Sequence, residues 1–466
     1  MKRRQFFRNS SLATFGGLIL GNPKVAGSYF RRAGKQARNI IFMVSDGMSS
    51  GTLTMADILH WRKTGKGTHW LNLYRENRVN RALMDMASAN SLVTDSAAAS
   101  SSWGGGRRVN NGSLNIGPNG EEHQPIWQKF QAAGRKVGCV TTVPITHATP
   151  AGFCVNSNSR NAQPDIALKY IDLRFDVMLG GGHEFFSSEA RADKQDLYAS
   201  YQSRGFQVAR SRRDLSSLTA AGPVLGVFQK DGLPYSVDRD HTPDLAESVP
   251  TIAEMTRFAI DRMKGAEKGF VLQVEGGKVD WAAHANCAAG LLYDQLAFDE
   301  AIRVALDFAE SDGNTLVILT TDHGNANPGL VAGSEVNRQF DTLQQYRHSN
   351  EWLLRGLTPQ SSISDIQDRA QYACGISLTT AEAGTLQSYY LKLTKGEDGT
   401  FNYTNLPFQT LAVMQKSRNS VSWISMDHSS DYVELAMLGP GSENLRPFMK
   451  NTDLHGFLLE AAGLEV

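Results

Sequence analysis

The stretch Asn39-Ile40-Ile41-Phe42-Met43-Val44, which runs directly into Ser45-Asp46-Gly47, decides the fold class of this 466-residue chain. Its length and its apolar, partly β-branched composition are typical of a strand that is buried on both faces of a sheet. Three further runs of this kind lead into polar residues: 136–142 before His147 and Thr149, 269–274 before Glu275, and 315–321 before Asp322 and His323. The repetition predicts several parallel, fully buried strands.

Helical patterns separate these runs. Apolar residues recur mostly at three- and four-residue steps over 252–263 and between His284 and Gly313. The alternation of strands and helices predicts an α/β fold with a doubly wound, mainly parallel central sheet flanked by helices. Ligands of such sheets bind beyond the carboxyl ends of the strands. Polar residues that follow different strands are therefore expected to meet at one edge of the sheet.

One segment interrupts the alternation. Residues 331–420 are polar, with short mixed segments, and lie before a closing apolar strand over 432–437. We therefore expect an inserted crown-like subdomain over 331–420. The α/β catalytic core is expected over 36–330 and 421–466.

The N-terminus is basic, because every charged residue before Asp46 is Lys or Arg. Lys2-Arg3-Arg4 precedes Phe6-Phe7 and a short apolar stretch over 12–20. That stretch is too short for a membrane span, which requires about 20 apolar residues. Residues 1–27 are interpreted as an export signal of the twin-arginine type, which predicts a periplasmic or secreted protein. A basic disordered tail is the alternative interpretation.

Charge and cysteine content exclude some function classes. The chain has 47 basic and 47 acidic residues, so no global field would recruit nucleic acid or an anionic membrane. Its cysteines show no CxxC spacing, which argues against a thiolate metal site, and they permit three complete pairings: Cys139, Cys154, Cys287 and Cys374. Buried free thiols are as good an interpretation as disulfides.

Several candidate metal ligands lie at strand ends. Asp280 and His284 are four residues apart on a helix expected directly after Glu275-Gly276-Gly277, so they share a face and can bind one cation. Taken alone, such a pair more often lies on a solvated helix face. Further donors are Asp46, Asp95 and the Asp322-His323 pair. Three or more carboxylates at one edge would repel one another unless cations neutralise them, which favours a site with several metals.

Ser96 stands before Ala97-Ala98-Ala99, at an expected helix N-terminus. By itself it would be interpreted as an N-cap, because a serine side chain accepts a bond from the backbone there. Beside a metal cluster, the same position exposes the hydroxyl to helix amides and to an incoming phosphate. The neighbouring ligands make Ser96 a candidate nucleophile.

Six short motifs together resemble the alkaline phosphatase family. They occur in the family's order and span most of residues 39–440: Val44-Ser45-Asp46-Gly47-Met48, Thr94-Asp95-Ser96-Ala97-Ala98, His147-Ala148-Thr149-Pro150-Ala151-Gly152, Val274-Glu275-Gly276-Gly277-Lys278-Val279-Asp280, Thr321-Asp322-His323-Gly324 and His428-Ser429-Ser430. Each motif is short, but the set is highly specific.

The resemblance implies two zinc ions and a third metal, which is magnesium in the usual family pattern. The first zinc would be held by Asp280, His284 and His428. The second would be held by Asp46, Asp322 and His323, with Ser96 bound to it as an alkoxide. The third ion would be held by Asp46, Thr149 and Glu275. Arg160 lies eleven residues after Thr149, at the family's spacing for the phosphate-binding arginine; a guanidinium suits two phosphate oxygens.

Two positions vary within the family. His147, a candidate ligand of the third metal, stands where some members have Asp, and an imidazole suits zinc or cobalt better than magnesium. Trp281 stands where some members have Lys or His. It is expected at the substrate, where it would pack on the cavity wall or hold a water that bridges to phosphate.

The function that the resemblance implies is hydrolysis of phosphate monoesters to alcohol and inorganic phosphate through a phosphoserine intermediate. The alternative is a phosphodiesterase or a sulfatase of the same superfamily. Ser96 argues against both, because related diesterases commonly use Thr and sulfatases need a Cys/Ser-x-Pro-x-Arg segment. An exported metal- or phosphate-binding protein without turnover is a further alternative. A homodimer is suggested by the resemblance alone.

Overall fold

The apolar runs form the middle of one sheet in the computed structural model, which describes residues 34–219, 221–395 and 405–465. They are β1 (Asn39–Val44), β3 (Lys136–Pro144), β7 (Phe270–Glu275) and β8 (Thr315–Thr320). β1 pairs in parallel with β8 on one side and with β7 on the other, and β7 pairs in parallel with β3. The predicted export signal over 1–27 lies outside the described residues.

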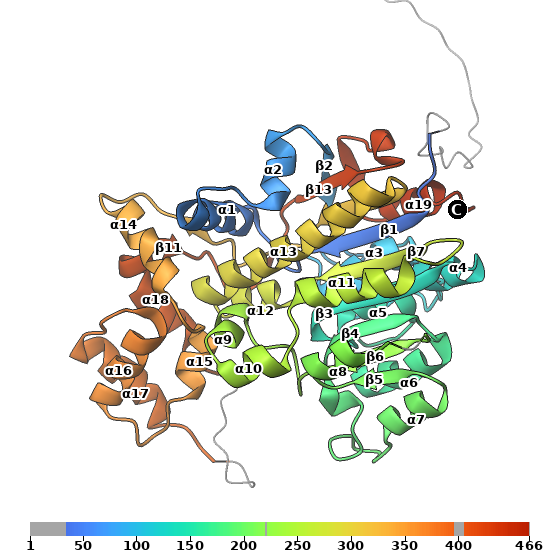
Figure 1. Cartoon of the computed structure of the whole chain (residues 1–466). Helices are drawn as coiled ribbons and strands as arrows, with labels where there is room; N and C mark the ends of the chain where they lie inside the picture. Colours follow the sequence, from blue (N-terminus) through green and yellow to red (C-terminus); the bar gives the residue numbers. More distant parts are fainter. Residues whose placement is uncertain (1–33, 220, 396–404, 466) are drawn as a thin grey trace, which may run out of the picture.

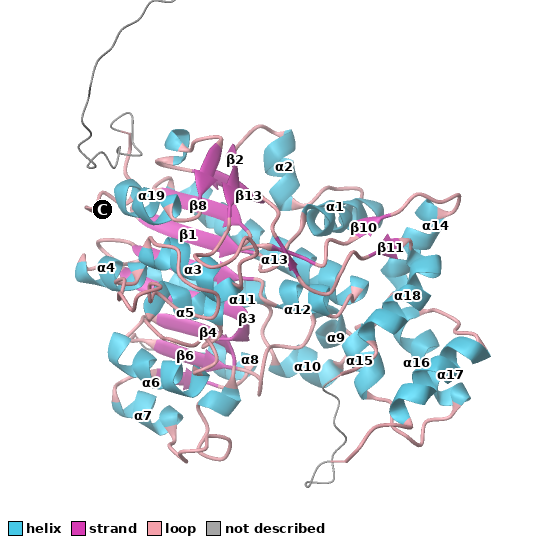
Figure 2. Ribbon diagram, turned by 180° about the vertical axis from the view of Figure 1, so that it is seen from behind, coloured by secondary structure: helices cyan, strands magenta, loops and turns pink. Residues whose placement is uncertain are grey.

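The complete sheet has ten strands in the order β14-β2-β13-β8-β1-β7-β3-β4-β6-β5. The outer strands are β2 (Asn80–Asp85), β4 (Val177–Gly181), β5 (Gln207–Ala209), β6 (Val224–Val227), β13 (Val433–Leu438) and β14 (Phe448–Lys450). β13, the closing strand predicted over 432–437, runs antiparallel to β2 and β8, whereas the other pairs are parallel. This mostly parallel sheet between helices confirms the predicted fold class (Figure 2).

Helices cover both faces of the sheet (Figure 1). One face packs on α1 (Ser50–Thr64), α2 (His69–Arg75), α8 (Arg212–Ser217), α9 (Ser236–Asp240), α10 (Pro243–Ser248), α11 (Ile252–Met263), α12 (Lys278–His284) and α13 (Ala288–Asp312). The other packs on α3 (Ser96–Gly105), α4 (Ile126–Ala132), α5 (Ala148–Cys154), α6 (Gln163–Leu173), α7 (Leu197–Ser203) and α19 (Asp453–Ala461). Short 3₁₀ turns lie at His183–Phe185 and Ser442–Asn444.

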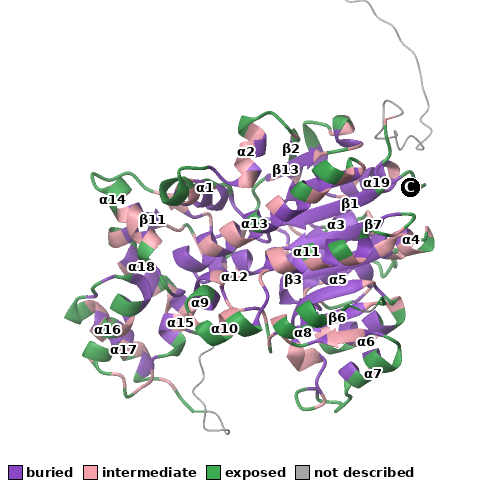
Figure 3. Cartoon of the chain, in the orientation of Figure 1, coloured by how far each residue is buried: buried purple, intermediate pink, exposed green. Residues whose placement is uncertain are grey.

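The alternation of side chains along β1 explains why the sheet has a core on each face. Ile41 and Met43 belong to the cluster that includes α1, α11 and α13, whereas Ile40 and Phe42 belong to the cluster that includes α3 and α5. The Phe42 ring lies 5.2 Å from the ring of Trp103, centroid to centroid. Figure 3 shows the buried strands between helices whose outer surfaces are exposed. The sheet is therefore a rigid base, and its strand ends can place side chains accurately.

Residues 331–420 form helices away from the sheet: α14 (Val336–Asp341), α15 (Asn350–Arg355), α16 (Ile363–Cys374), α17 (Thr380–Tyr390) and α18 (Phe408–Asn419), with a 3₁₀ turn at Thr342–Gln345. They gather at the left of Figure 1. The flanking strands β10 (Gly329–Leu330) and β11 (Val421–Ser422) pair antiparallel, so both ends of the segment meet. Buried side chains of α15 and α16 belong to the same hydrophobic cluster as α1 and α13.

A second small antiparallel pair lies at the carboxyl edge of the sheet. β9 (Gly324–Asn325) follows β8 closely and pairs with β12 (His428–Ser429). This pairing carries the C-terminal part of the chain back over the strand ends. Among the described residues, no helix combines the length and the apolar character that a bilayer span requires.

The four cysteines are buried free thiols: Cys139 in β3, Cys154 at the end of α5, Cys287 before α13 and Cys374 at the end of α16. Of the two interpretations left open by the sequence, the structure has the free thiols. The Cys287 sulfur accepts hydrogen bonds from the backbone N–H groups of Gly290 (3.3 Å) and Asn350 (3.1 Å). It thus serves the fold as a helix cap.

The purified, non-reduced protein should therefore contain four titratable thiols after denaturation and almost none before it, because a thiol reagent cannot reach buried sulfur. Titration with an aromatic disulfide reagent, with and without guanidinium chloride, measures both numbers. Two or fewer thiols in the denatured, non-reduced protein would show that disulfides form and would contradict the structure.

Candidate active site and metal centre

Asp46 lies two residues beyond β1, where the chain turns at Gly47 with φ +66°. A Cβ on Gly47 would stand 2.5 Å from Asp280 Oδ1, so only glycine lets these two segments approach so closely. Asp46 is fully buried, and the Thr149 hydroxyl donates to its Oδ2 at 3.1 Å. Asp46 Oδ1 lies 3.6 Å from His323 Nε2. The end of β1 thus places a buried carboxylate between two other segments.

Glu275 ends β7 and lies opposite Val44 of β1 and Thr141 of β3 in the register of the sheet. The Thr141 hydroxyl donates a short hydrogen bond to the Glu275 carboxylate. Gly277 then leads into α12; a Cβ there would stand 2.7 Å from the Val143 methyl groups. Because the chain at Gly277 has no room for a side chain, α12 begins directly after the end of β7, as the sequence predicts.

Asp322 and His323 follow β8 and are also fully buried. Asp322 Oδ1 accepts from the backbone N–H of Gly47 at 3.0 Å, and Asp322 Oδ2 lies 3.1 Å from His323 Nε2. The pairing of β9 with β12 brings His428 onto His323, with ring centroids 3.7 Å apart. Three strand ends and the returning chain thus meet at one place.

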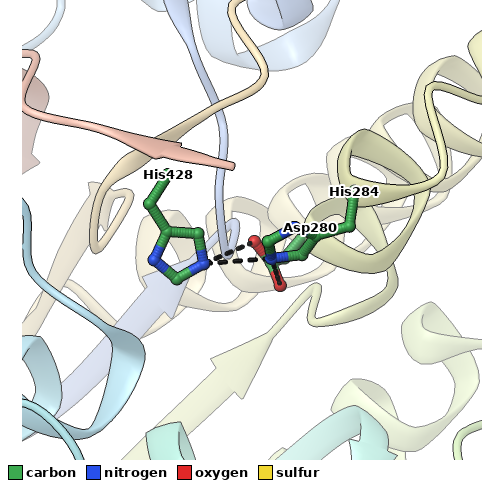
Figure 4. Close-up of side chains that lie close together, drawn as sticks. All are labelled: Asp280, His284 and His428. Atoms are coloured by element: carbon green, nitrogen blue, oxygen red, sulfur yellow. Dashed lines mark hydrogen bonds and ion pairs between the residues drawn. The ribbon is translucent and has the colours of Figure 1, made fainter. Parts of the chain in front are cut away.

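Asp280, His284 and His428 form the first group of possible metal ligands (Figure 4). The two Nε2 atoms lie 3.1 Å apart, and Asp280 carboxylate oxygens lie 3.4 Å from His284 Nε2 and 3.6 Å from His428 Nε2. Each Nδ1 faces a backbone carbonyl oxygen, of Met426 for His284 (2.6 Å) and of Thr94 for His428 (2.9 Å). Protons on Nδ1 satisfy these carbonyls, so both Nε2 lone pairs point at one position, as in zinc sites.

The structure brings together two further groups, Asp46–Asp280–His323 and Asp46–His147–Glu275. In each group the possible ligand atoms lie within 4.8 Å of one another. Asp280, expected only at the first site, therefore also faces the second. Asp322, expected as a ligand of the second metal, lies against His323 but outside the group. Thr149 reaches the third group through its hydrogen bond to Asp46.

Buried ligand atoms without hydrogen-bond partners concentrate here. They are Asp46 Oδ1, His147 Nδ1 and Glu275 Oε1. Such atoms are costly to bury, and cations would satisfy them together. The residues present therefore fit a cluster of divalent metal ions.

The electrostatics agree with that fit. Burial, reinforced by the charges of Asp322 and Asp280, raises the pKa of Asp46 well above its ordinary value. Burial raises the pKa of Glu275 to about 7. In contrast, burial by itself would raise the pKa of Asp322, but the His323 charge and the hydrogen bonds from His323 and Gly47 together lower it to about 2. Without cations, these carboxylates cannot all ionise at neutral pH at low cost.

Ser96 is the first residue of α3, but Asp95 caps this helix, because Asp95 Oδ1 accepts from the backbone N–H of Ala98 at 2.9 Å. The interpretation of Ser96 as the N-cap is therefore wrong. Its hydroxyl is almost fully buried and lies 3.3 Å from His323 Nε2. The hydroxyl is thus left free at the positive end of a helix, beside the second group.

Asp95 holds Arg160 beside Ser96. Arg160 Nη1 lies 3.1 Å from Asp95 Oδ2, which also accepts from the backbone N–H of Gly112 at 2.9 Å. Arg160 Nη2 lies 3.1 Å from His147 Nε2. The sequence suggested Asp95 as a further metal-site oxygen donor, but its carboxylate is occupied by the helix cap and the arginine.

Trp281 is partly buried next to these residues, with its ring 6.1 Å from the His147 ring, centroid to centroid. Lys278 Nζ lies 4.5 Å from the Trp281 ring centroid and 3.8 Å from that of Tyr235. A Cβ on Gly232 would stand 2.9 Å from the indole. Trp281 thus packs against the protein on one side and flanks His147 on the other.

Sequence reasoning missed two residues that support the ligands. Asn325 Nδ2 donates to Asp280 Oδ1 at 2.7 Å, and Thr141 donates to Glu275 as described above. Asn325 follows the Asp322-His323-Gly324 motif directly, and Thr141 lies in a strand that ends in polar residues. Their closeness in sequence to the strand-end ligands was the available signal.

The fold and the site define a class: an α/β protein whose strand ends carry groups suited to several metal ions. The family model described as alkaline phosphatase matches residues 37–464. The chain belongs to the alkaline phosphatase family. Its enzyme class is accordingly phosphomonoesterase, and the family is metal-dependent.

Similar proteins agree with this assignment. The chain is 32% identical over 369 residues to the alkaline phosphatase of Escherichia coli, with 68% of this chain and 78% of that protein covered. It is 27% identical over 424 residues to alkaline phosphatase 4 of Bacillus subtilis, with 90% and 87% covered. The crystal structure of Thermus thermophilus alkaline phosphatase matches with a TM-score of 0.85 at 31% identity, covering 93% of this chain and 92% of that one. The family and enzyme class predicted from the motifs are confirmed.

A buried carboxyl group outside the metal groups allows a test of pH dependence. Asp294 on α13 accepts hydrogen bonds from the backbone N–H and the hydroxyl of Ser236, and burial raises its pKa to about 7. Its folded pKa exceeds its unfolded pKa, so the folded state binds more protons and stability falls as the pH rises towards 7. Relative to Asp294→Asn, the wild type should lose about 2 kcal/mol between pH 5 and pH 8.

Urea unfolding of both metal-loaded proteins at the two pH values measures this difference, and the titration of the metal groups cancels in the comparison. A constant difference between wild type and Asp294→Asn across this range would contradict the raised pKa.

Proposed function

We propose that this protein is an exported alkaline phosphatase that hydrolyses phosphate monoesters through a phosphoserine intermediate on Ser96. One observation supports the mechanism. Asp95 caps α3, so the Ser96 hydroxyl is not needed as a cap, and it lies 3.3 Å from His323 Nε2 beside the buried groups of possible metal ligands. Ser96 Oγ would attack phosphorus as the bond to the ester oxygen breaks, which releases the alcohol. Water would then attack the phosphoserine and release inorganic phosphate.

The proposed cofactors are two zinc ions and a third ion, magnesium in the family pattern. Asp280, His284 and His428 would hold the first, and Asp46, His323 and Asp322 the second. Asp46, Thr149, Glu275 and His147 would hold the third, where the imidazole favours a softer ion than magnesium. Bound there, the ions would supply Lewis-acid stabilisation of the attacking and leaving oxygens and activation of water.

The protein's own groups orient the phosphate. The Arg160 guanidinium, fixed by Asp95, can donate to two phosphate oxygens at once. The N-terminal amides of α3 face the same anion. In-line attack requires the leaving oxygen to lie opposite Ser96 Oγ. We infer that it lies at the Asp280–His284–His428 group, where the His284 side chain is 40% exposed and the alcohol can leave.

Export and assembly are further proposals. The basic, twin-arginine-like stretch over 1–27 supports a periplasmic or secreted location, and the family supports a homodimer. The alternative activities lack support in the chain. Related phosphodiesterases commonly use Thr where this chain has Ser96, and a sulfatase needs a Cys/Ser-x-Pro-x-Arg segment where Ala97-Ala98-Ala99 follows Ser96.

Replacing Ser96 by Ala should lower the hydrolysis of an aryl phosphate by at least about 10³-fold, because the nucleophile is lost. The matched control is Ser102→Ala on the same helix, whose buried hydroxyl donates to Ala98 O within α3 and should be dispensable. Rates are measured on an aryl phosphate, its diester and an aryl sulfate, with chelator and after zinc is restored.

Full metal-dependent monoesterase activity in Ser96→Ala would refute the nucleophile. A faster rate on the diester or the sulfate than on the monoester would refute the substrate class.

Replacing Asp95 by Asn should keep the helix cap, since Asn caps as well as Asp, but should remove the charged partner of Arg160. We expect kcat/KM for the aryl phosphate to fall about tenfold with little change in Tm. Arg160→Ala should lower kcat/KM by about 10- to 100-fold, because the charge-assisted hydrogen bonds from the guanidinium to the phosphate are lost.

Asp196→Asn is the matched control, because Asp196 caps α7, away from the site, by accepting from the backbone N–H of Ala199. An unchanged kcat/KM in Asp95→Asn would show that Asp95 acts as a cap alone.

A further inference from the structure

A cavity of about 210 Å³ lies between α18 and the segment that links β11 to β12. Its lining combines an indole, small apolar groups, amides, hydroxyls and an ammonium group: Asn286, Gln409, Ala412, Val413, Lys416, Val421, Ser422, Trp423 and Ser425. Ligand sites commonly show this mixture of apolar surface and a few polar groups. At this volume, below the roughly 300 Å³ of a drug-sized site, the cavity suits a single ring system.

The wall of this cavity also supports the first metal group. Asn286 lies two residues after His284, and its side-chain amide, oriented to satisfy its surroundings, donates to the carbonyl oxygen of Ser425 at 2.9 Å. The next residue, Met426, accepts from His284 Nδ1, and His428 follows two residues later. The cavity wall is therefore continuous in sequence with the segments that hold His284 and His428, the group at which the leaving alcohol is expected.

The lining favours a flat ring that carries hydrogen-bond acceptors. Trp423 offers an aromatic face, and Val413 on α18 is 68% exposed. Lys416 is exposed on the same helix, and the lining holds no carboxylate among the described residues, so the ammonium group is available to a ligand. Guanine presents two adjacent acceptors, O6 and N7, to such a cation, and bases stack on aromatic side chains.

We propose that this cavity is a subsite for the base of a nucleoside 5′-monophosphate, and that it gives these esters preference over simple alkyl phosphates. The inference rests on the proposed function, because the phosphate must lie between Ser96 and Arg160 while the alcohol extends past His284. The base would stack on Trp423, with Lys416 and the Gln409 amide at its acceptors.

A second, larger cavity serves as an internal control. It has about 480 Å³ and is lined by residues of α8, α10 and α11, including Arg212, Arg213 and Glu254. Arg212 already forms an ion pair with Glu254 in its wall. None of its lining residues belongs to a metal group or to the segment that supports one. A substitution at exposed Arg213 removes a surface cation without touching the proposed subsite.

The test compares guanosine 5′-monophosphate with ethyl phosphate, since both are esters of primary alcohols. In Trp423→Ala, kcat/KM for the nucleotide should fall about tenfold, the loss expected for one stacked base, while kcat/KM for ethyl phosphate stays within twofold. Lys416→Gln should lower the nucleotide value severalfold in the same selective way. Arg213→Ala should leave both values unchanged.

A binding measurement on inactive variants tests the subsite without turnover. Zinc-loaded Ser96→Ala should bind guanosine 5′-monophosphate about tenfold more tightly than Ser96→Ala/Trp423→Ala in a calorimetric titration, with equal affinity of both proteins for inorganic phosphate. Equal losses for the two esters, or equal nucleotide affinity in the two variants, would overturn the subsite. Inactivity of the wild type on both esters would refute the proposed function instead, and the calorimetric result would still decide the subsite.

Discussion

The structure depends on one electrostatic constraint: several buried carboxylates share one edge of a sheet. Asp46, Glu275, Asp280 and Asp322 are each at most 5% exposed, and their burial would be prohibitive if all were charged and unneutralised. The parallel register forces this meeting, because β1, β7 and β8 end side by side. Imidazole nitrogens and carboxylate oxygens converge on common points, where divalent ions can neutralise the carboxylates and replace the missing hydrogen-bond partners.

The surrounding structure is arranged to keep those atoms free for ions. Histidine Nδ1 atoms at the first group are occupied by backbone carbonyls, which leaves Nε2 available. Asp95 takes over the cap of α3, which leaves the Ser96 hydroxyl available. In each case another group forms the hydrogen bond that the fold requires, so the chemically active atom stays free to bind an ion or the substrate. Asp95 has two such roles, because it caps α3 and also holds Arg160 in an ion pair.

Much of this was predictable from the sequence. Buried parallel strands have a continuous apolar pattern, and the residues just beyond them must meet, so the fold class and the convergence of the ligands followed from local patterns. The roles of Asp95 and Asn325 did not, because their partners Arg160 and Asp280 lie 65 and 45 residues away and are set by tertiary structure. The family motifs implied Asp322 as a ligand of the second group, whereas the structure turns Asp280 towards that position as well.

The helices of 331–420 were missed for another reason. They are short and polar on their outer sides, so their apolar residues form no continuous run. The sequence nevertheless indicates where α16 and α17 begin, because Ser362 with Asp365 and Thr379 with Glu382 form capping boxes. The outer strands β2 and β14 also escaped prediction, since their side chains are partly exposed and lack the pattern of the central strands.

The pairing of β10 with β11 has an evolutionary consequence. It brings the two ends of the 331–420 segment together, so this segment can lengthen, shorten or be exchanged without moving the strands that hold Asp46, Glu275 and Asp322. α18 belongs to that segment, and it forms one wall of the cavity beside His284. Selectivity for the alcohol could therefore diverge between relatives through a replaceable module, while the chemistry of phosphate transfer stays fixed in the sheet.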